Sequence, residues 1–352
     1  MAKNYAFIPS VSVVMSVWNE EKVIKDKLLN LLAMDYPVDK VEILVGSDGS
    51  TDSTPELVYQ FKDERVRFFD YQERRGKMSV LNDLVKEARY DIVLFCDARQ
   101  RFAPDVIKEL TANFADPKVG CVSGELVIED NGTGASQGVG MYWTYEKFIR
   151  REESGIHSIM GATGAIYAIR RELFKNVPTH IVLDDMFIPF SIIQLGYRAI
   201  FDPSAKAFDK AVQNSDEEFR RKVRTLAGNF QIFLLFPGIF NPLKSPIAWQ
   251  LFSHKFLRLK IPFLMVLLFI INFLLFTNNL IYSVMACLQV VFYGCAMLGM
   301  MTQKNSGMIG KILKKIGAVP YMFCVLNFSA LVGFWRFATS QQKVTWEKAV
   351  DK

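Results

Sequence analysis

Three polar positions in the first hundred residues could together bind a phosphorylated ligand. Asp48 stands in the tight "SDGS" turn, Lys77 follows a glycine in "RRGK", and Asp97 ends the apolar run "IVLFC". A carboxylate such as Asp48 can accept hydrogen bonds from a base or a ribose hydroxyl. Lys77 offers a cation where a phosphate could approach a helix start, and Asp97 could bind a divalent cation that neutralises a diphosphate. Each residue alone is as readily a turn or cap residue, but their order along the chain favours nucleotide binding.

Two adjacent carboxylates later in the chain could supply a general base. Asp184 and Asp185 lie between the apolar stretches "HIVL" and "MFIPF". One of them could therefore be partly desolvated, with a raised pKa, and take a proton from an attacking hydroxyl. Either could instead cap the helix that "MFIPFSIIQLG" predicts. We favour Asp185 as the base and Asp184 as a cap or a neighbour of the phosphates.

The elements around these residues alternate between strand and helix patterns. Apolar, β-branched runs predict four strands, at 11–17, 41–47, 66–71 and 91–97. Helical spacing of apolar residues predicts helices at 20–35 and 77–89. This alternation predicts an α/β fold with a parallel sheet and right-handed crossovers. Ligands of such sheets bind at the carboxyl ends of the strands, so one edge should collect the polar residues that end these runs, at 18–20, 48–50, 73–77 and 97.

Composition divides the chain into a globular part and a membrane part. The 352 residues are 51% hydrophobic and 22% charged, too apolar for a wholly soluble enzyme and too charged for a wholly membrane-embedded chain. Residues 1 to about 225 read as a globular sequence that is large enough to build its own core. Five cysteines without disulfide or metal-ligand spacing indicate reduced thiols, and the start resembles a strand rather than a signal peptide. The globular part is therefore expected in the cytoplasm.

Three apolar segments follow, at 261–276, 280–301 and 319–338, and the second is clearly long enough to cross about 30 Å of hydrocarbon. The basic stretches "SHKFLRLK" and "GKILKKIG" flank the first two segments, which places both flanks in the cytoplasm and "TNN" outside. These basic stretches suit anionic lipids better than nucleic acid, because they adjoin the apolar segments. The third segment either crosses, which puts the tail outside, or is re-entrant.

The stretch before the first apolar segment is apolar but broken by prolines. Residues 230–252 read "FQIFLLFPGIFNPLKSPIAWQLF", which fits interfacial helices better than a span, with a buried helix of the globular domain as the alternative. We expect a globular domain over 1–228, interfacial helices over 229–258, a transmembrane region over 259–340 and a tail over 341–352.

Several motifs together resemble one known family. In order along the chain they are "VSVVMSVWNEEKVI", "VGSDGSTDST", "RGKMSVLNDL", "FCDARQRFAPD", "GATGAIYAIRREL", "LDDMFIPFSIIQLGYRAIFDPSAKAFD" and "FRRKVRTLAGNFQ". Over roughly residues 8–260 the chain resembles the family 2 glycosyltransferases, in the branch that includes membrane-anchored polysaccharide synthases. The resemblance implies a GT-A fold, which is Rossmann-like with a mainly parallel sheet. It also implies a nucleoside-diphosphate sugar as donor, usually a UDP-sugar, together with Mg²⁺ or Mn²⁺.

The resemblance also implies roles for particular residues. The implied donor site consists of Trp18, Glu20, Asp48, Lys77, Asp97, Arg221 and Arg224. Trp18 and Glu20 would border the base, and Asp97 matches the first acid of the family's D-x-D motif and is the implied metal ligand. Asp185 matches the catalytic base. The implied acceptor site consists of Gly161, Thr163, Gly164 and Asp184.

Two departures from the family pattern bear on function. Arg99 stands where the second acid of D-x-D is expected, and it either reaches a phosphate as a cation or is an exposed residue without a role. In the Q-x-x-R-W element the first and last positions are Arg221 and Thr225, which weakens the case for a polymerising enzyme.

The sequence therefore favours an inverting transferase in the cytoplasmic (inner) membrane, with several crossings and a cytoplasmic catalytic domain. It would add one sugar from a nucleotide donor to a lipid-linked or cell-surface glycan. A processive exopolysaccharide synthase and a catalytically inactive membrane scaffold are the alternatives. Membrane lipids are the other expected partner, nucleic acid is not expected, and an oligomer or a partner subunit is possible.

Overall fold

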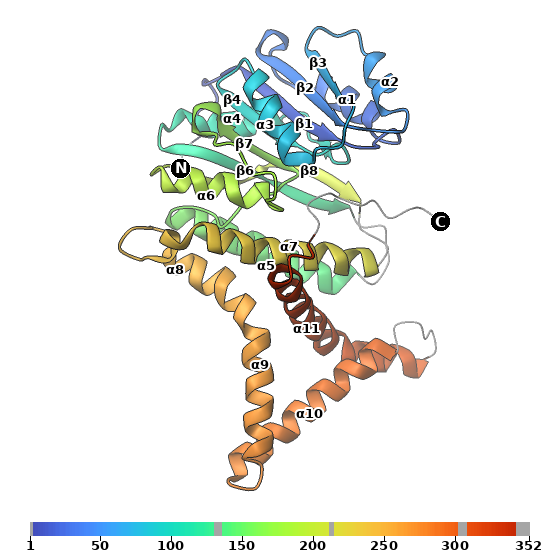
Figure 1. Cartoon of the computed structure of the whole chain (residues 1–352), viewed down its shortest axis with the longest axis vertical. Coiled ribbons are helices and arrows are strands. Elements are labelled where there is room, and N and C mark those ends of the chain that lie inside the picture. The colour runs from blue at the N-terminus through green and yellow to red at the C-terminus, as the bar shows by residue number, and fades with distance from the viewer. Residues whose placement is uncertain (1–2, 130–135, 211–214, 302–307, 343–352) are drawn as a thin grey trace.

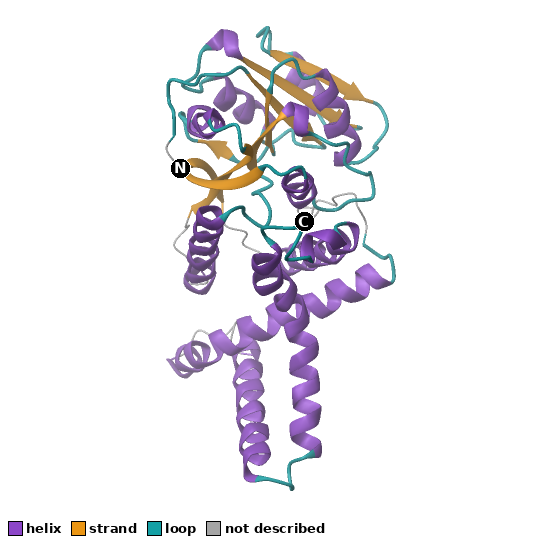
Figure 2. Ribbon diagram, turned by 90° about the vertical axis from the view of Figure 1, so that its left-hand side faces the viewer, coloured by secondary structure: helices purple, strands orange, loops and turns teal. Residues whose placement is uncertain are grey.

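The computed structural model describes residues 3–129, 136–210, 215–301 and 308–342, and only the backbone at 136–143, 215–218 and 308–315. A sheet domain lies at one end of the molecule and three long helices project from the other, with α5 and α7 between them (Figures 1 and 2). The helices are α1 Ile24–Leu32, α2 Thr54–Tyr59, α3 Lys77–Glu87, α4 Val106–Thr111, α5 Ser136–Ile156, α6 Asp184–Gln194, α7 Ser215–Leu235, α8 Ala248–Gln250, α9 Leu257–Leu274, α10 Leu280–Met301 and α11 Met308–Ala338.

The sheet has eight strands in the order β3-β2-β1-β4-β7-β6-β8-β5. They are β1 Val11–Val17, β2 Val41–Asp48, β3 Val66–Tyr71, β4 Ile92–Cys96, β5 Arg101–Phe102, β6 Val119–Glu129, β7 Ile166–Arg170 and β8 Arg198–Lys210. The four strands expected from the sequence form a continuous parallel half. The other half is mixed, because β7 runs antiparallel to both of its neighbours, β4 and β6.

Helices cover both faces of the parallel half, and the strand sequences show it. Val13 and Met15 on β1 join one apolar cluster, while Val14 between them joins the other. Side chains of a strand alternate between the faces of the sheet, so a strand that is buried on both faces is apolar throughout. This is why the runs of β1, β2 and β4 were recognisable as strands of a covered parallel sheet; β3, the edge strand, is only partly buried.

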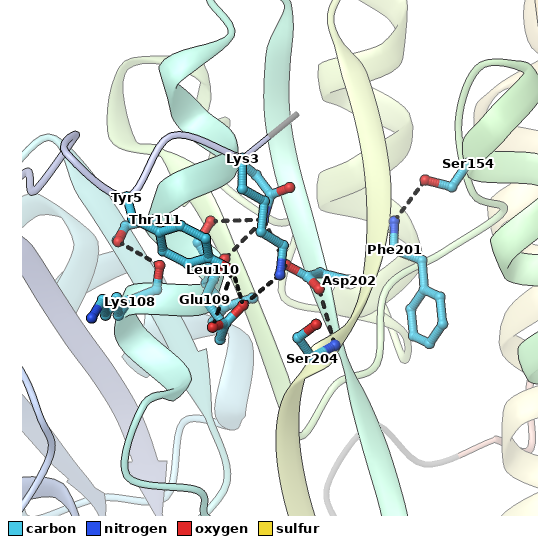
Figure 3. A network of polar contacts seen from close by, with 11 residues as sticks. Lys3, Tyr5, Lys108, Glu109, Leu110, Thr111, Ser154, Phe201, Asp202 and Ser204 are labelled. Carbon is cyan, nitrogen blue, oxygen red and sulfur yellow. Dashed lines mark hydrogen bonds and ion pairs between the residues drawn. The ribbon is translucent and has the colours of Figure 1, made fainter. Parts of the chain in front are cut away.

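The N-terminal segment is held against the sheet domain by charge. The ammonium of Lys3 forms ion pairs with Glu109 of α4 and, at 2.8 Å, with Asp202 of β8. The buried Asp202 carboxylate also accepts a hydrogen bond of 2.7 Å from the Asn113 side chain. Figure 3 shows this network on the side of the strands that carries α4.

Three helices are long and apolar enough to cross a membrane: Ala248–Leu274, Leu280–Met301 and Ile316–Ala338. The first begins thirteen residues before the expected 261, because a π-helical turn at Leu251–Phe256 joins α8 to α9 without a break. Residues 248–258, expected to be interfacial, are thus the first turns of this helix. The rest of the expected interfacial stretch, before residue 248, contains the end of α7 and a short 3₁₀ turn at Pro237–Phe240.

The end of α11 lies beside the sheet domain. Phe334 and Phe337 stack around Phe230 of α7, with ring centroids 5.2 and 5.9 Å away. At Gly333 the two helices are so close that a Cβ would lie 3.0 Å from Leu226. These contacts favour the re-entrant alternative for the third apolar segment and not a tail on the far side. The tail at 343–352 itself lies outside the described residues.

The crossing of α10 and α11 depends on two glycines. A Cβ on Gly317 would lie 2.5 Å from the Cα of Gly299, closer than any side chain permits, and small residues are what lets membrane helices approach in this way. We expect Gly317→Leu to destabilise the membrane region by about 1–3 kcal/mol through overpacking. Thermal unfolding in detergent measures this. Ala318→Leu is the matched control, because Ala318 is the exposed neighbour; equal melting temperatures for the two variants would contradict the crossing.

Candidate active site

The carboxyl ends of β3, β2, β1 and β4 lie side by side, because these strands are adjacent and parallel. Asp48 is the last residue of β2, Trp18 follows β1, and Asp97 follows β4. Lys77 is the first residue of α3, directly after the loop that leaves β3. The fold therefore brings the predicted donor-site residues of the first hundred positions to one edge.

Asp48 braces the loop that precedes Lys77. Its buried carboxylate accepts hydrogen bonds from the backbone N–H of Arg75 at 2.7 Å and of Gly76 at 2.9 Å. Gly76 has a φ of +90°, in the left-handed region that glycine tolerates best. The direct contact that Asp48 makes in this structure is therefore with the loop that positions Lys77. Contact with a base or ribose stays a prediction.

Trp18 lies against an arginine that the sequence analysis did not single out. The guanidinium of Arg74 stacks 3.5 Å from the centre of the Trp18 ring, which is a favourable cation–π arrangement. Beside it, Glu20 donates its backbone N–H to the hydroxyl of Thr54 at 2.8 Å, which ties the end of β1 to α2. Base recognition by Trp18 and Glu20 remains a prediction, and a base that stacks on Trp18 would meet Arg74 as well.

Lys77 is the central cation of the site. Its ammonium lies 3.1 Å from the Asp97 carboxylate and 3.5 Å from that of Asp184. Burial lowers the pKa of Lys77, but the two carboxylates outweigh burial, so the pKa lies above its ordinary value. Lys77 is therefore charged at every physiological pH and connects the D-x-D position on β4 with the acidic pair on α6.

Asp184 is held from its other side by a buried phenol. The hydroxyl of Tyr167 donates to Asp184 at 2.9 Å, and the Tyr167 ring stacks on Phe95 of β4 with centroids 4.7 Å apart. Asp184 is in the first turn of α6, and the residue at the N-cap is Leu183, without a side-chain cap. Asp184 is therefore not the cap of α6, and it lies beside the Lys77 ammonium; its place next to the phosphates of a donor stays a prediction.

Asp185 has the properties of a general base. Burial, and next the charge of Asp184, raise its pKa to about 6, although Lys77 and Arg150 act in the opposite direction. The glycine-rich loop after α5 packs on it. A Cβ on Gly164 would lie 3.1 Å from the Asp185 carboxylate, and the Asp185 carbonyl accepts the N–H of Ala162 at 2.7 Å.

Side chains of α5 and β6 form hydrogen bonds to the same loop. Arg150 donates a hydrogen bond of 2.7 Å to the hydroxyl of Thr163, and Ser123 of β6 accepts the Thr163 N–H at 2.8 Å. Gly161, which opens the loop, has a φ of +130°. Gly161, Thr163 and Gly164, the predicted acceptor residues, thus lie beside the candidate base.

The helix α7 adds a second cation to the site. Burial lowers the pKa of Arg224, and the charges of Asp184, Asp185 and Asp97 act against this shift. Arg224 is therefore within electrostatic range of all three carboxylates, as is expected of a residue that meets a diphosphate. Arg221, one turn away, acts on Arg224 as a like charge.

Arg99 forms an ion pair away from Asp97. Its guanidinium donates at 2.6 Å to Asp209 of β8, a buried carboxylate that also accepts from the Gln100 side chain at 2.9 Å. The Arg99 side chain is 42% exposed. The sequence left two alternatives for Arg99, a contact with a phosphate or no role. The structure adds a third, in which Arg99 neutralises the charge of Asp209 from the turn after β4.

A divalent cation would find one protein ligand at this edge. Among the described residues, no group of three or more His, Cys, Asp or Glu side chains could hold a metal alone. The half-exposed Asp97 nevertheless offers a hard oxygen next to the candidate diphosphate site. Mg²⁺ is commonly held by one or two carboxylates together with substrate phosphates and water. The residues therefore fit a metal that arrives with the donor.

Arg150 and Tyr167 escaped the sequence analysis, and Arg74, placed on this edge with the rest of 73–77, was given no role there. Arg74 precedes the "RGK" motif directly and Tyr167 lies in "GAIYAIR", so adjacency to a motif was an available signal. Arg150 is one basic residue in the charged helix "YEKFIRREES", and nothing in its sequence surroundings distinguishes it.

Comparison with solved structures defines the class of the fold. The chain superposes on the mannosyltransferase PcManGT from Pyrobaculum calidifontis, solved with GDP-Man and Mn²⁺, with a TM-score of 0.71. The alignment covers 97% of this chain and 90% of that one at 22% identity. The sheet domain is therefore a GT-A domain, followed by apolar helices.

Sequence comparison points to the same class. Residues 12–177, just under half of the chain, match the model of "Glycosyl transferase family 2". The poly-beta-1,6-N-acetyl-D-glucosamine synthases of Staphylococcus aureus (strain COL) and Staphylococcus epidermidis are 28% and 25% identical over 234 residues. These alignments cover 64% of this chain, and the chain spans only 56% of the length of each synthase.

The brace that Asp48 provides can be tested directly. Asp48→Ala leaves the N–H groups of Arg75 and Gly76 without their acceptor, which costs about 1–3 kcal/mol for a buried donor. Hydrogen exchange at residues 75–77 should therefore accelerate. Asp70→Ala on the adjacent strand is the control. Unchanged exchange in Asp48→Ala would show that the loop does not depend on this carboxylate.

Proposed function

We propose that the protein is an inverting glycosyltransferase that moves a sugar from a nucleoside-diphosphate donor, a UDP-sugar in the first place, to a lipid-linked or cell-surface glycan. The observation that carries this proposal is the arrangement of Asp185, which has a raised pKa, beside the Lys77–Asp184 pair and the glycine-rich loop. The match of residues 12–177 to the glycosyltransferase family 2 model and the GT-A fold support it.

The reaction needs one base and a stabilised leaving group. The acceptor hydroxyl oxygen attacks the anomeric carbon of the donor sugar while its proton passes to the Asp185 carboxylate. The bond from that carbon to the diphosphate oxygen breaks, and the nucleoside diphosphate leaves with the electron pair. Attack from the face opposite the leaving group inverts the anomeric centre.

The leaving group would be stabilised by the cations on the other side of the site. The Lys77 ammonium is held between Asp97 and Asp184 before the reaction starts, and a preorganised charge of this kind stabilises a developing anion most effectively. The charge of Arg224 acts on the same carboxylates. A Mg²⁺ or Mn²⁺ ion on Asp97 would supply further positive charge to the diphosphate when bound. PcManGT, which shares the fold, was solved in complex with GDP-Man and Mn²⁺, and this supports the assignment.

The membrane placement is part of the proposal. Three helices have the length and composition of membrane spans, and their basic flanks favour the cytoplasmic face of the inner membrane for the sheet domain. There the donor is soluble and a lipid-linked acceptor would present its sugar at the bilayer surface.

A donor screen tests the proposed function. Purified full-length protein would be offered UDP-N-acetylglucosamine, UDP-glucose and GDP-mannose, with release of nucleoside diphosphate as the readout. Release from one of them is expected; release from none would count against the proposal.

The name of the staphylococcal relatives favours polymer synthesis as a second candidate. A ladder of products from a labelled donor would establish that candidate over a single addition.

Asp185 makes the proposal sensitive to pH. The carboxylate form is needed and is lost as pH falls through the pKa of about 6, so transfer at saturating donor should decline below about pH 6. Lys77 lowers that pKa, so Lys77→Gln should move the acidic limb to higher pH.

Asp185→Asn should reduce turnover by at least about 10²-fold and retain donor binding, measured by calorimetry.

A matched control for Asp185→Asn is Asp91→Asn, because the Asp91 side chain is 96% exposed. Turnover in Asp185→Asn equal to that of Asp91→Asn would remove Asp185 as the base. An acidic limb that stays in place in Lys77→Gln would mean that another group titrates.

Metal dependence should report on Asp97 and Arg99. EDTA should weaken donor binding in the wild type, and Asp97→Asn should abolish this metal effect. Arg99→Asp restores the second acid of D-x-D and should lower the Mn²⁺ concentration for half-maximal activity. Arg101→Asp, at an exposed position two residues away, is the control. If wild type and Arg99→Asp need the same Mn²⁺ concentration for half-maximal activity, Arg99 has no role in metal binding and only its ion pair with Asp209 stands.

A further inference from the structure

The buried face of α1 contains a lysine. The helix buries Ile24, Lys27, Leu28 and Leu31, which is the spacing of the apolar stripe of an amphipathic helix. An apolar side chain is expected at each of these positions, yet position 27 holds a lysine that is only 3% exposed. Burial of an ammonium costs free energy, and a residue that breaks the local pattern at such a cost is expected near a functional site.

Lys27 contacts the segment that directly follows Asp97. Its ammonium donates a hydrogen bond of 2.8 Å to the backbone carbonyl of Gln100 and lies 3.6 Å from the centre of the Phe102 ring. Among the residues that the structure describes, Lys27 forms no ion pair. The contacts with this segment, a carbonyl and an aromatic face, therefore offset the cost of burying its charge.

Asn30, one turn later on α1, holds the same segment. Its side-chain amide donates to the backbone carbonyl of Phe102 at 3.0 Å, and its side-chain oxygen accepts the Phe102 N–H at 2.7 Å. Lys27 and Asn30 thus bind main-chain atoms of Gln100 and Phe102. Through these atoms α1 fixes the path of the backbone after Asp97.

The strand β8 holds the segment from another side. The side chains of Arg99 and Gln100 donate to the buried Asp209, and Arg101 and Phe102 form the short strand β5, which pairs with β8. Residues 99–102 therefore lie between α1 and β8. Of the two contacts from α1, the one made by Lys27 is nearer to Asp97 along the chain.

Lys27 also acts on Asp97 through its charge. Burial lowers the pKa of Lys27, and the neighbouring Cys96 and Asp97 act against this shift. Asp97 is therefore within electrostatic range of a buried ammonium, in addition to that of Lys77 at 3.1 Å. A positive charge nearby favours the ionised form of a carboxylate, which is the form that binds a hard cation.

We propose that Lys27 is a positioning residue of the donor site, which holds the turn after β4 through the Gln100 carbonyl and so keeps the Asp97 carboxylate in place to bind a divalent cation together with the diphosphate. The proposal rests on the proposed function, because that function gives Asp97 its role. Lys27 itself touches neither the donor nor the cation. Its position explains why a lysine occupies the apolar face of α1.

The test compares nucleotide binding with and without metal. Lys27→Met keeps the approximate length of the side chain and removes its charge and its hydrogen bond. The Kd for UDP, or for GDP if the screen identifies a GDP-sugar, is measured by calorimetry in Mn²⁺ and in EDTA. Lys27→Met should raise the Kd in Mn²⁺ by about three- to tenfold, as expected for one lost hydrogen bond to a charged group. The Kd in EDTA should stay at the wild-type value, because the effect acts through the cation on Asp97.

Hydrogen exchange tests the contact without any ligand. Exchange at residues 98–102 should be faster in Lys27→Met than in the wild type, because the Gln100 carbonyl has lost its partner. Asn30→Ala removes the second contact from α1 and should have the same two effects, on exchange and on the Kd in Mn²⁺. Lys27→Gln keeps a shorter hydrogen-bond donor, and its Kd in Mn²⁺ should lie between those of the wild type and Lys27→Met.

Two controls on the same helix separate positioning from stability. Lys25→Met is the same substitution at an exposed position of α1 and should behave as the wild type. Leu31→Ala leaves a cavity on the buried face of α1 and should lower the melting temperature, but it should keep the wild-type Kd in Mn²⁺. An equal rise of this Kd in Leu31→Ala and Lys27→Met would overturn the proposal, because Lys27 would then act only through the stability of the helix.

The remaining outcomes distinguish this proposal from the proposed function. Wild-type exchange at residues 98–102, or a wild-type Kd in Mn²⁺, in Lys27→Met would overturn the positioning role and leave the transferase standing. If Lys27→Met does not fold, the same results in Lys27→Gln and Asn30→Ala decide in the same way. A wild-type protein that binds neither UDP nor GDP in Mn²⁺ would count against the proposed function itself.

Discussion

The ammonium of Lys77 between the carboxylates of Asp97 and Asp184 connects parts of the chain more than a hundred residues apart. Lys77 begins α3, Asp97 follows β4 and Asp184 begins α6, so these ion pairs can form only when the parallel and the mixed halves of the sheet are joined. Three carboxylates close together repel one another, and the positive charge of Lys77 offsets this repulsion. The same charges allow Asp185 to keep a raised pKa without losing its ionised form at neutral pH.

Much of the surrounding structure holds this cation in place. The Asp48 carboxylate accepts hydrogen bonds from the loop before Lys77. Tyr167 donates a hydrogen bond to Asp184, and Arg150 donates one to Thr163 in the loop that packs on Asp185. These three residues hold the side chains and the loop of the candidate site in position. A site that must stabilise a leaving anion gains from this rigidity, because no reorganisation is then needed during the reaction.

The membrane helices are coupled to the sheet domain through α5 and α7. Ion pairs connect α5 to the turn before α9 and to α9 itself, and aromatic stacking connects α7 to α11. Both α5 and α7 also carry residues of the candidate site, Arg150 and Arg224. The catalytic edge is thus placed at a fixed distance from the apolar helices, which suits an acceptor that is itself tied to a membrane.

The sequence by itself determined the parallel half of the sheet. Its three inner strands are buried on both faces and therefore mostly apolar, and the edge strand β3 follows the same alternation of strand and helix along the chain. It also determined the apolar helices, since their length and composition are local properties. It also located Asp48, Lys77, Asp97 and the acidic pair, because strand ends of a parallel sheet share one edge. Only the tertiary structure decided the partner of each residue: Asp209 for Arg99, a backbone loop for Asp48, and α7 for the end of α11. Such pairings depend on the packing of distant segments, and no local pattern of residues records them.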